Sequence, residues 1–379
     1  MQRLYWRQAH VSRVVHVLVA VIAAGALFAA ERFQQVRVEP DFEIKRAAAQ
    51  RMERGMELLR NHRVRRVAPV DAALDPTGSG MIGVASSSTT TNAGSLAAKR
   101  TTANPNWAAA MIDLLRRAGV EPGDAVAIGV SGSFPALNLA AYVAVEEMGL
   151  EAVAISSAGA SSFGANLPGL TWLDMERLLA AAEITRTRSV AASLGGTRDQ
   201  ALGMQDRGRR QLRAAIDRND VAFIDVDTEQ TSIDQRMELY DTRAEGRRFA
   251  AYINVGGSLV SIGPKSVKRL YRAGVNLRPH PRGTHIDSVM MRFLNDTIPV
   301  INLSKVVPLA ESYGLPVEPE SAPRVGEGAV FEKRTHDRRL VGALVVGLLA
   351  ASFALLRLDW GARLVELGGG GGSKLERMV

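Results

Sequence analysis

Short apolar runs alternate with amphipathic segments through most of the chain. Fully apolar runs suit strands that are buried on both faces, and apolar residues three or four positions apart suit helices. This pattern predicts strands at 125–130, 152–156, 189–192, 221–226, 249–255, 259–262 and 298–303. It predicts helices at 107–118, 136–148, 171–179, 207–216, 233–243, 289–294 and around Leu309. The alternation indicates an α/β body over residues 63–330, with a mostly parallel sheet covered by helices on both faces in a Rossmann-like arrangement.

Two longer apolar runs bracket this body. Residues 14–30 and 340–356 are almost entirely apolar and have charged residues on both sides. Each run has about the minimum length that spans a bilayer, and we predict one transmembrane helix at each end of the body. A core helix is the alternative for the second run.

The N-terminal segment 1–13 carries three arginines, which is typical of a signal peptide or signal anchor. We expect an uncleaved anchor, because the apolar run is longer than the usual core of a signal peptide. Cleavage before Glu31, after a run of small residues, is the alternative.

The orientation in the membrane depends on basic residues that flank both spans. The arginines of segment 1–13 favour cytoplasmic ends, whereas those between 333 and 339 favour a cytoplasmic body. Because the first helix usually dominates, we expect a protein of the cell (inner) membrane with its body outside the cytoplasm.

Three other segments complete the chain. Residues 42–62 are rich in helix formers and predict an amphipathic connecting helix. A Gly/Ser/Thr-rich stretch follows at 75–102. The end of the chain, 364–379, contains five consecutive glycines at 368–372 and is expected to be a flexible tail.

Composition excludes several classes of protein. The 379 residues are 46% hydrophobic and 23% charged, which is ample apolar material for a core. There is no cysteine, so disulfides, thiol catalysis and Cys-ligated metals are excluded. The formal net charge is +8, but acids and bases alternate along the chain and we expect no nucleic-acid partner.

The turn at 129–135 is the best candidate for a ligand site. It joins a predicted strand to a predicted helix, where backbone amides and the helix N-terminus suit an anion. Its candidate ligand-binding residues are Gly129, Ser131, Gly132 and Ser133. The turn matches neither a dinucleotide fingerprint nor a P-loop, and Ser133 stands where a nucleophile elbow needs glycine. A tight turn with serine as helix cap is the structural alternative.

Small polar residues also follow the other strands. Ser156, Ser157 and Asn166 lie at or beyond the second strand, and Asn254 ends a later one. Because the carboxyl ends of parallel strands meet at one edge, we expect these residues to share a cleft. Lys99, which ends a Ser/Thr-rich segment, is a further candidate for contact with an anionic ligand.

Catalytic roles have few candidates in the sequence. Ser131 and Ser133 are possible nucleophiles, and either needs a base such as His285, which lies close to Asp287. We expect no metal site, and the sequence specifies no cofactor. Asp174 and Glu176 lie at the start of a predicted helix, where the helix dipole alone favours carboxylates.

Eight stretches that run through most of the body match a known family. They are DPTGSGMIG (75–83), GSLAAKR (94–100), TANPNWAA (102–109), GVSGSFPALN (129–138), ISSAGASSFGAN (155–166), TWLDMERLL (171–179), SVAASLGG (189–196) and INVGG (253–257). In these stretches the chain resembles the membrane-anchored poly-gamma-glutamate system proteins. The resemblance implies an accessory role in the synthesis, export or attachment of a capsule-type polymer, with the synthase subunits as partners. It brings no catalytic mechanism with it.

Three functions are consistent with these features. The first is an accessory membrane protein whose cleft accepts the anionic polymer or its precursor. The second is a serine-dependent hydrolase or amide-transfer enzyme acting on either of them. The third is a non-catalytic scaffold of the synthase complex.

Overall fold

The computed structural model describes residues 13–357, so nearly all of segment 1–13 and the whole tail 364–379 lie outside the described residues. The chain divides into two compact units. The body is Glu39–Glu332, and the terminal unit combines the segments before and after it.

A seven-stranded sheet forms the centre of the body, with strand order β5-β4-β3-β2-β6-β8-β7. All neighbouring pairs are parallel except β7 with β8. The strands are β2 (Ala125–Ser131), β3 (Glu151–Ser157), β4 (Ser189–Ser193), β5 (Ala222–Phe223), β6 (Phe249–Asn254), β7 (Gly274–Asn276) and β8 (Val300–Asn302). The predicted α/β class with a mostly parallel sheet is therefore confirmed.

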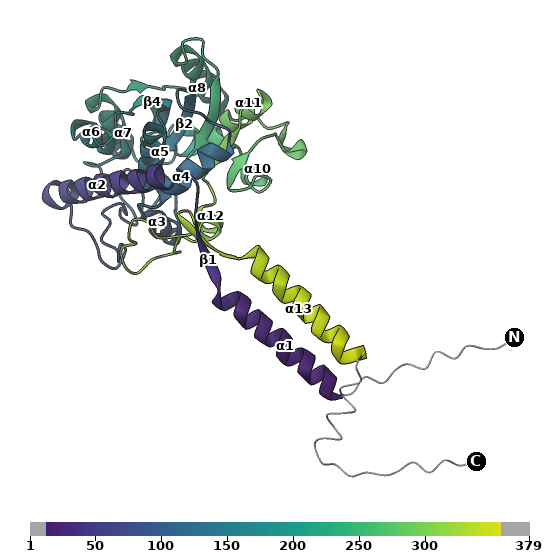
Figure 1. Ribbon diagram of the computed structural model, residues 1–379. Helices are drawn as coiled ribbons and strands as arrows, with labels where there is room; N and C mark the ends of the chain where they lie inside the picture. The colour runs from purple at the N-terminus through teal and green to yellow at the C-terminus, as the bar shows by residue number, and fades with distance from the viewer. Residues whose placement is uncertain (1–12, 358–379) are drawn as a thin grey trace, which may run out of the picture. The chain divides into compact units, whose positions relative to one another are not determined.

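Helices cover both faces of the sheet, as predicted (Figure 1). One face packs against α2 (Phe42–Arg66), α4 (Trp107–Arg117), α5 (Pro135–Glu147) and α12 (Val306–Ser312). The other packs against α8 (Glu229–Arg243), α9 (Leu259–Ile262) and α11 (Val289–Asn295). Alternate residues of β2 enter the two cores, with Val126 and Ile128 on one side and Ala127 on the other. Burial on both faces explains why this strand is apolar throughout.

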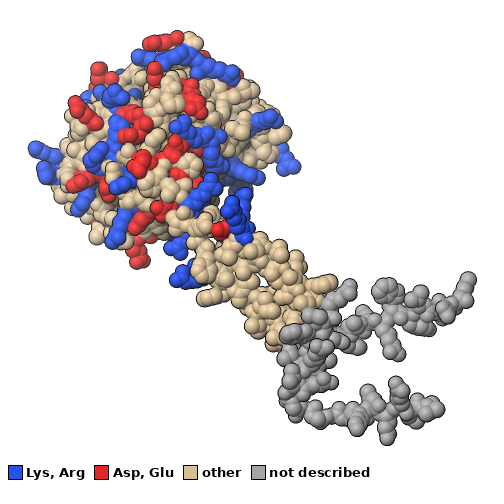
Figure 2. Space-filling view, in the orientation of Figure 1, with Lys and Arg blue, Asp and Glu red and all other residues tan. Residues whose placement is uncertain are grey.

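The remaining body elements lie towards the β4 and β5 side or in the loops. They are α3 (Leu96–Thr102), α6 (Trp172–Ala181), a 3-10 turn η1 (Thr197–Asp199), α7 (Asp206–Arg218), α10 (Lys265–Lys268) and a second 3-10 turn η2 (Pro281–Gly283). On the face that Figure 2 shows, acidic and basic side chains are interspersed over the body.

Some predicted elements differ from those observed. The predicted strand at 259–262 is wrong, because these residues form the short helix α9. Ser258 caps α9 by accepting a hydrogen bond from the amide of Ser261. The predicted strand at 221–226 is reduced to the two residues of β5, and helix α3 lies within the polar stretch at 75–102, where no element was predicted.

The terminal unit contains two long apolar helices, α1 (Arg13–Arg32) and α13 (Arg338–Arg357), which pack together. Strands β1 (Gln34–Val38) and β9 (Glu332–His336) pair in a two-stranded sheet. Both helices are long and apolar enough to cross a membrane, and their side chains are almost all outside any protein core. These helices correspond to the two predicted transmembrane segments.

Candidate functional site

The ends of the parallel strands place a row of small polar residues along one edge of the sheet. In the order β4, β3, β2, β6 and β8, the last residues are Ser193, Ser157, Ser131, Asn254 and Asn302. The register aligns Ser131 with Ser157, Ser157 with Ser193, and Asn254 with Asn302. The predicted convergence of these turns at one edge is therefore present.

The turn at 129–135 uses much of its hydrogen-bonding capacity within the protein. The amide of Gly132 donates to the carbonyl of Ser157 at 3.1 Å, and the amide of Ser133 donates to Ser131 Oγ at 3.3 Å. The carbonyl of Gly132 accepts from the amide of Ala165 at 2.7 Å. The free amides expected at Gly132 and Ser133 are thus already engaged.

Gly132 is required by close packing between two loops. A Cβ at this position would lie 3.0 Å from the Cβ of Ala160 and 3.1 Å from the carbonyl oxygen of Gly159. The space at Gly129 is tighter still, because a Cβ there would clash severely with the Tyr252 hydroxyl. These glycines let the loops and core approach one another closely.

Three predicted ligand residues make internal contacts. Asn166 is fully buried, and its side chain accepts from the amide of Val84 at 3.0 Å and donates to the carbonyl of Val84 at 2.8 Å. Asn254 donates to the carbonyl of Gly256 at 2.9 Å. The buried hydroxyl of Ser156 hydrogen-bonds that of Ser189. In the present geometry these side chains hold loops and strands together.

A buried charged cluster that the sequence did not indicate lies beside Ser157 and Ser193. Asp199 accepts from Ser193 Oγ at 2.8 Å and from Arg236 at 2.9 Å. Arg236, from α8, also donates to Ser193 Oγ at 2.8 Å. Burial lowers the pKa of Arg236, but the charge of Asp199 and its hydrogen bond, together with the nearby Tyr240 and Tyr252, leave the pKa above its ordinary value.

Lys99 is brought to the strand-end turns from α3, a helix capped by Ser95. Its side chain is buried, with only 3% of the residue exposed. The ammonium donates to Ser161 Oγ at 3.1 Å and lies 3.4 Å from the centroid of the Phe134 ring. The amide of Ser161 in turn donates to Ser133 Oγ at 3.1 Å, which links Lys99 to the predicted turn.

The charge of Lys99 has no ionic compensation from the described part of the protein. No carboxylate of residues 13–357 forms an ion pair with it, and burial lowers its pKa from 10.5 to about 7. Desolvation acts in this direction because a low-dielectric environment disfavours the charged form. The face of the Phe134 ring opposes this shift by stabilising a cation.

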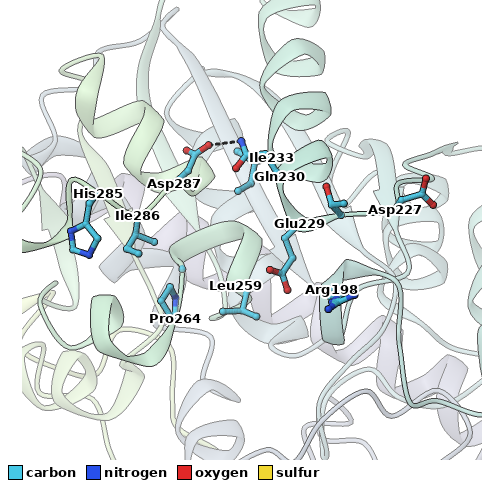
Figure 3. A pocket seen from close by; sticks show the side chains of 12 residues that line it. Arg198, Asp227, Glu229, Gln230, Ile233, Leu259, Pro264, His285, Ile286 and Asp287 are labelled. Carbon is cyan, nitrogen blue, oxygen red and sulfur yellow. Dashed lines mark hydrogen bonds between the residues drawn. The ribbon is translucent and has the colours of Figure 1, made fainter.

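His285 and Asp287 line a separate cavity of about 650 Å³ (Figure 3). Arg198, Asp227 and Glu229 also line it. Asp287 accepts from Gln230 at 2.7 Å, and hydrogen bonds from Arg292 hold the pKa of Asp287 below its usual range.

His285 and Asp287, the predicted candidates for a catalytic base, do not lie beside the predicted nucleophiles Ser131 and Ser133. Neither Ser131 nor Ser133 lines the cavity of His285 and Asp287. Over residues 13–357, no hydrogen bond joins His285 or Asp287 to either hydroxyl. Within the same range, no group of three His, Asp or Glu side chains is placed to hold a metal ion.

Asp174 and Glu176 have structural partners, in line with the helix-start interpretation. Asp174 accepts from the amide and hydroxyl of the N-cap Thr171, both at 2.8 Å, and pairs with Arg218. Glu176 is fully buried and accepts from the Tyr142 hydroxyl at 2.6 Å. Burial raises the pKa of Glu176, although its hydrogen bonds act in the opposite direction.

Comparisons with known proteins do not add a relative. No protein-family model, no curated protein and no solved structure matches this chain. The likeness to poly-gamma-glutamate system proteins therefore rests on the sequence motifs alone.

Proposed function

We propose that this protein is an accessory membrane protein of poly-gamma-glutamate synthesis or export, and that its body binds a carboxylate of the polymer or its precursor beside Lys99. The observation that supports this proposal most directly is the buried ammonium of Lys99 without a carboxylate partner in the described structure. The sequence resemblance supplies the identity of the polymer.

The physical argument is one of charge compensation. An isolated charge is costly to bury, and the cost falls when an opposite charge and hydrogen bonds accompany it. A carboxylate next to Lys99 provides this compensation. The hydroxyl of Ser133, which is only partly buried and is joined to Lys99 through Ser161, is a hydrogen-bond donor for the same ligand.

Binding of a carboxylate is coupled to protonation of Lys99. With a pKa of about 7, Lys99 is largely protonated at pH 6 and mostly neutral at pH 8. If only the ammonium binds the ligand, the affinity falls about ten-fold over this interval.

Calorimetric titration of the full-length protein in detergent with gamma-glutamyl oligomers measures this dependence. We expect proton uptake near pH 8, weaker binding there than at pH 6, and loss of binding in Lys99→Met. Lys268→Met is the matched control, because burial also lowers the pKa of Lys268, which lies after β6. Binding that is independent of pH, or that persists in Lys99→Met, contradicts the proposal.

A cellular test separates binding from a scaffold role. We expect Lys99→Met to fail to restore polymer production in a strain that lacks the gene, while Lys268→Met restores it. Full restoration by a stably expressed Lys99→Met protein refutes the ligand role and favours a scaffold of the synthase complex.

We further propose that α1 and α13 span the cell membrane with the body outside the cytoplasm, beside the synthase subunits. The arginines that precede α1 in the sequence support this orientation. Reporter fusions at about residue 200 test it. Activity there of a reporter that works only in the cytoplasm contradicts the orientation.

A further inference from the structure

The only side-chain hydrogen bond that the Ser161 hydroxyl makes within residues 13–357 is to a buried amine. Its Oγ lies 3.1 Å from Lys99 Nζ. We infer that Ser161 and Lys99 form an acyl-transfer site, with Ser161 as the nucleophile and Lys99 as its general base, that hydrolyses amide bonds. This activity goes beyond ligand binding, and its chemistry requires only these two side chains.

Ser161 and Lys99 differ in exposure to solvent, as expected for a nucleophile and a desolvated base. Ser161 is partly exposed, whereas Lys99 is 3% exposed and shielded from water. The backbone of Ser161 is fixed on both sides. Its amide donates to Ser133 Oγ at 3.1 Å, and its carbonyl accepts from the amide of Gly164 at 3.0 Å. A nucleophile held in this way loses little additional freedom on attack.

Neighbouring serines are less suited to the role. Ser133 Oγ accepts the amide of Ser161, and Ser131 Oγ accepts the amide of Ser133. Within the described residues, neither hydroxyl hydrogen-bonds to a basic side chain. Ser161 alone among the three has an adjacent amine.

The protonation state of Lys99 matches the requirement for a base. A pKa of about 7 leaves a substantial fraction of neutral amine at neutral pH, whereas an exposed lysine is almost entirely protonated there. Desolvation is also the means by which lysine is generally adapted to act as a base. A general base positioned in this way contributes about 10²- to 10⁴-fold to the rate.

The proposed reaction proceeds in two balanced steps. The Ser161 hydroxyl proton moves to Lys99 Nζ as Oγ bonds to the acyl carbon, and the C–N bond breaks as the lysine proton passes to the departing amine. A water molecule then gives a proton to Lys99 and bonds to the ester carbon. Ser161 Oγ leaves and takes the proton back, so the products are a carboxylic acid and an amine.

The surroundings favour a polar amide as substrate. The hydroxyl of Ser133 and the backbone of Gly94 and Gly164 lie close to Ser161 or its loop. If the ligand is the polymer, the amide that links its units is the bond cleaved. This identification rests on the proposed function, whereas the reactivity of Ser161 does not.

Active-site labelling tests the inference on the full-length protein. A fluorophosphonate probe, followed by peptide mass mapping, identifies the reactive serine, and release of p-nitrophenol from p-nitrophenyl acetate measures acylation. We expect the label on Ser161 and an acylation rate that rises with pH to a plateau above about pH 7. Lys99→Met should lower the rate at least 100-fold, and Ser161→Ala should abolish labelling.

Matched variants keep the test specific. Ser162→Ala removes an adjacent hydroxyl in the same loop, and Lys268→Met removes another lysine of lowered pKa; both should react like the wild type. Absence of labelling, labelling of another serine, or an unchanged rate in Lys99→Met overturns the inference. As the pH rises, carboxylate binding beside Lys99 should weaken, whereas the acylation rate of Ser161 should increase. The binding proposal and the acyl-transfer proposal can therefore fail independently of each other.

Discussion

Replacement of Lys99 by methionine should stabilise the body at low pH. In the folded protein, burial lowers the pKa of Lys99 from 10.5 to about 7, which corresponds to about 5 kcal/mol at 1.36 kcal/mol per pKa unit. We therefore expect the burial of this charge to cost up to about 5 kcal/mol in free energy of unfolding at pH 6.

The sign of the pH dependence follows from proton binding. Between pH 7 and 10.5 the unfolded chain holds the Lys99 proton and the folded protein does not, so the contribution of Lys99 to stability rises with pH. Below pH 7 both states are protonated and the full cost is present. Methionine has no such dependence, and the advantage of Lys99→Met should shrink from pH 6 to pH 10.

Urea unfolding of the full-length protein in detergent, followed by tryptophan fluorescence at pH 6, 8 and 10, measures this difference. Trp107 and Trp172 are fully buried and report on the body. Methionine also gains hydrophobic burial, but that gain is independent of pH, so the change in the difference between pH 6 and pH 10 is the decisive quantity. A difference that stays constant with pH refutes the reasoning, because it means that Lys99 is not desolvated.

Three further substitutions test other parts of the body. Gly132→Val should destabilise it by about 1–3 kcal/mol through clashes with the second strand-end loop, whereas Gly169→Ala, with its nearest neighbouring atom at 4.0 Å, should change the unfolding midpoint little. Arg236→Met should cost about 3–5 kcal/mol because it leaves Asp199 buried without its ion-pair partner; a neutral effect in urea unfolding contradicts that account. Burial raises the pKa of Asp174, but hydrogen bonds from Arg218, Asn219 and Thr171 and the charge of Arg218 together lower it below its ordinary value. Asp174→Asn should therefore be less stable than the wild type at pH 7, with the difference disappearing on acidification towards pH 2.

The sequence predicted the strand and helix order well where the apolar pattern was long. The apolar strand at 125–130 and the helix at 107–118 correspond closely to β2 and α4. Burial on both faces gives a strand a continuous apolar run, and burial of one helix face gives apolar residues three or four positions apart. The run at 259–262 is too short to show a period, and its β-branched residues suggested a strand. The serine cap at its start determined a helical turn instead.

The site was only partly predictable. The placement of Ser131, Ser157 and Asn254 at one edge followed from the parallel topology. Whether their side chains faced a ligand or one another depended on loop packing, which the sequence does not show. The contact between Lys99 and Ser161 joins helix α3 to a loop 62 positions further along the chain, and no local pattern encodes such a pair.

The two edge strands of the sheet affect how readily copies of the protein aggregate through their sheets. The outermost strands, β5 and β7, contain only two and three residues, and β7 is antiparallel to its neighbour β8. Short edges offer few unpaired backbone groups to another chain and so discourage edge-to-edge aggregation. If α1 and α13 anchor the protein in a bilayer, as proposed above, its copies meet one another far more often than proteins free in solution do. The short edge strands then allow many copies to share a small area of membrane without their sheets pairing.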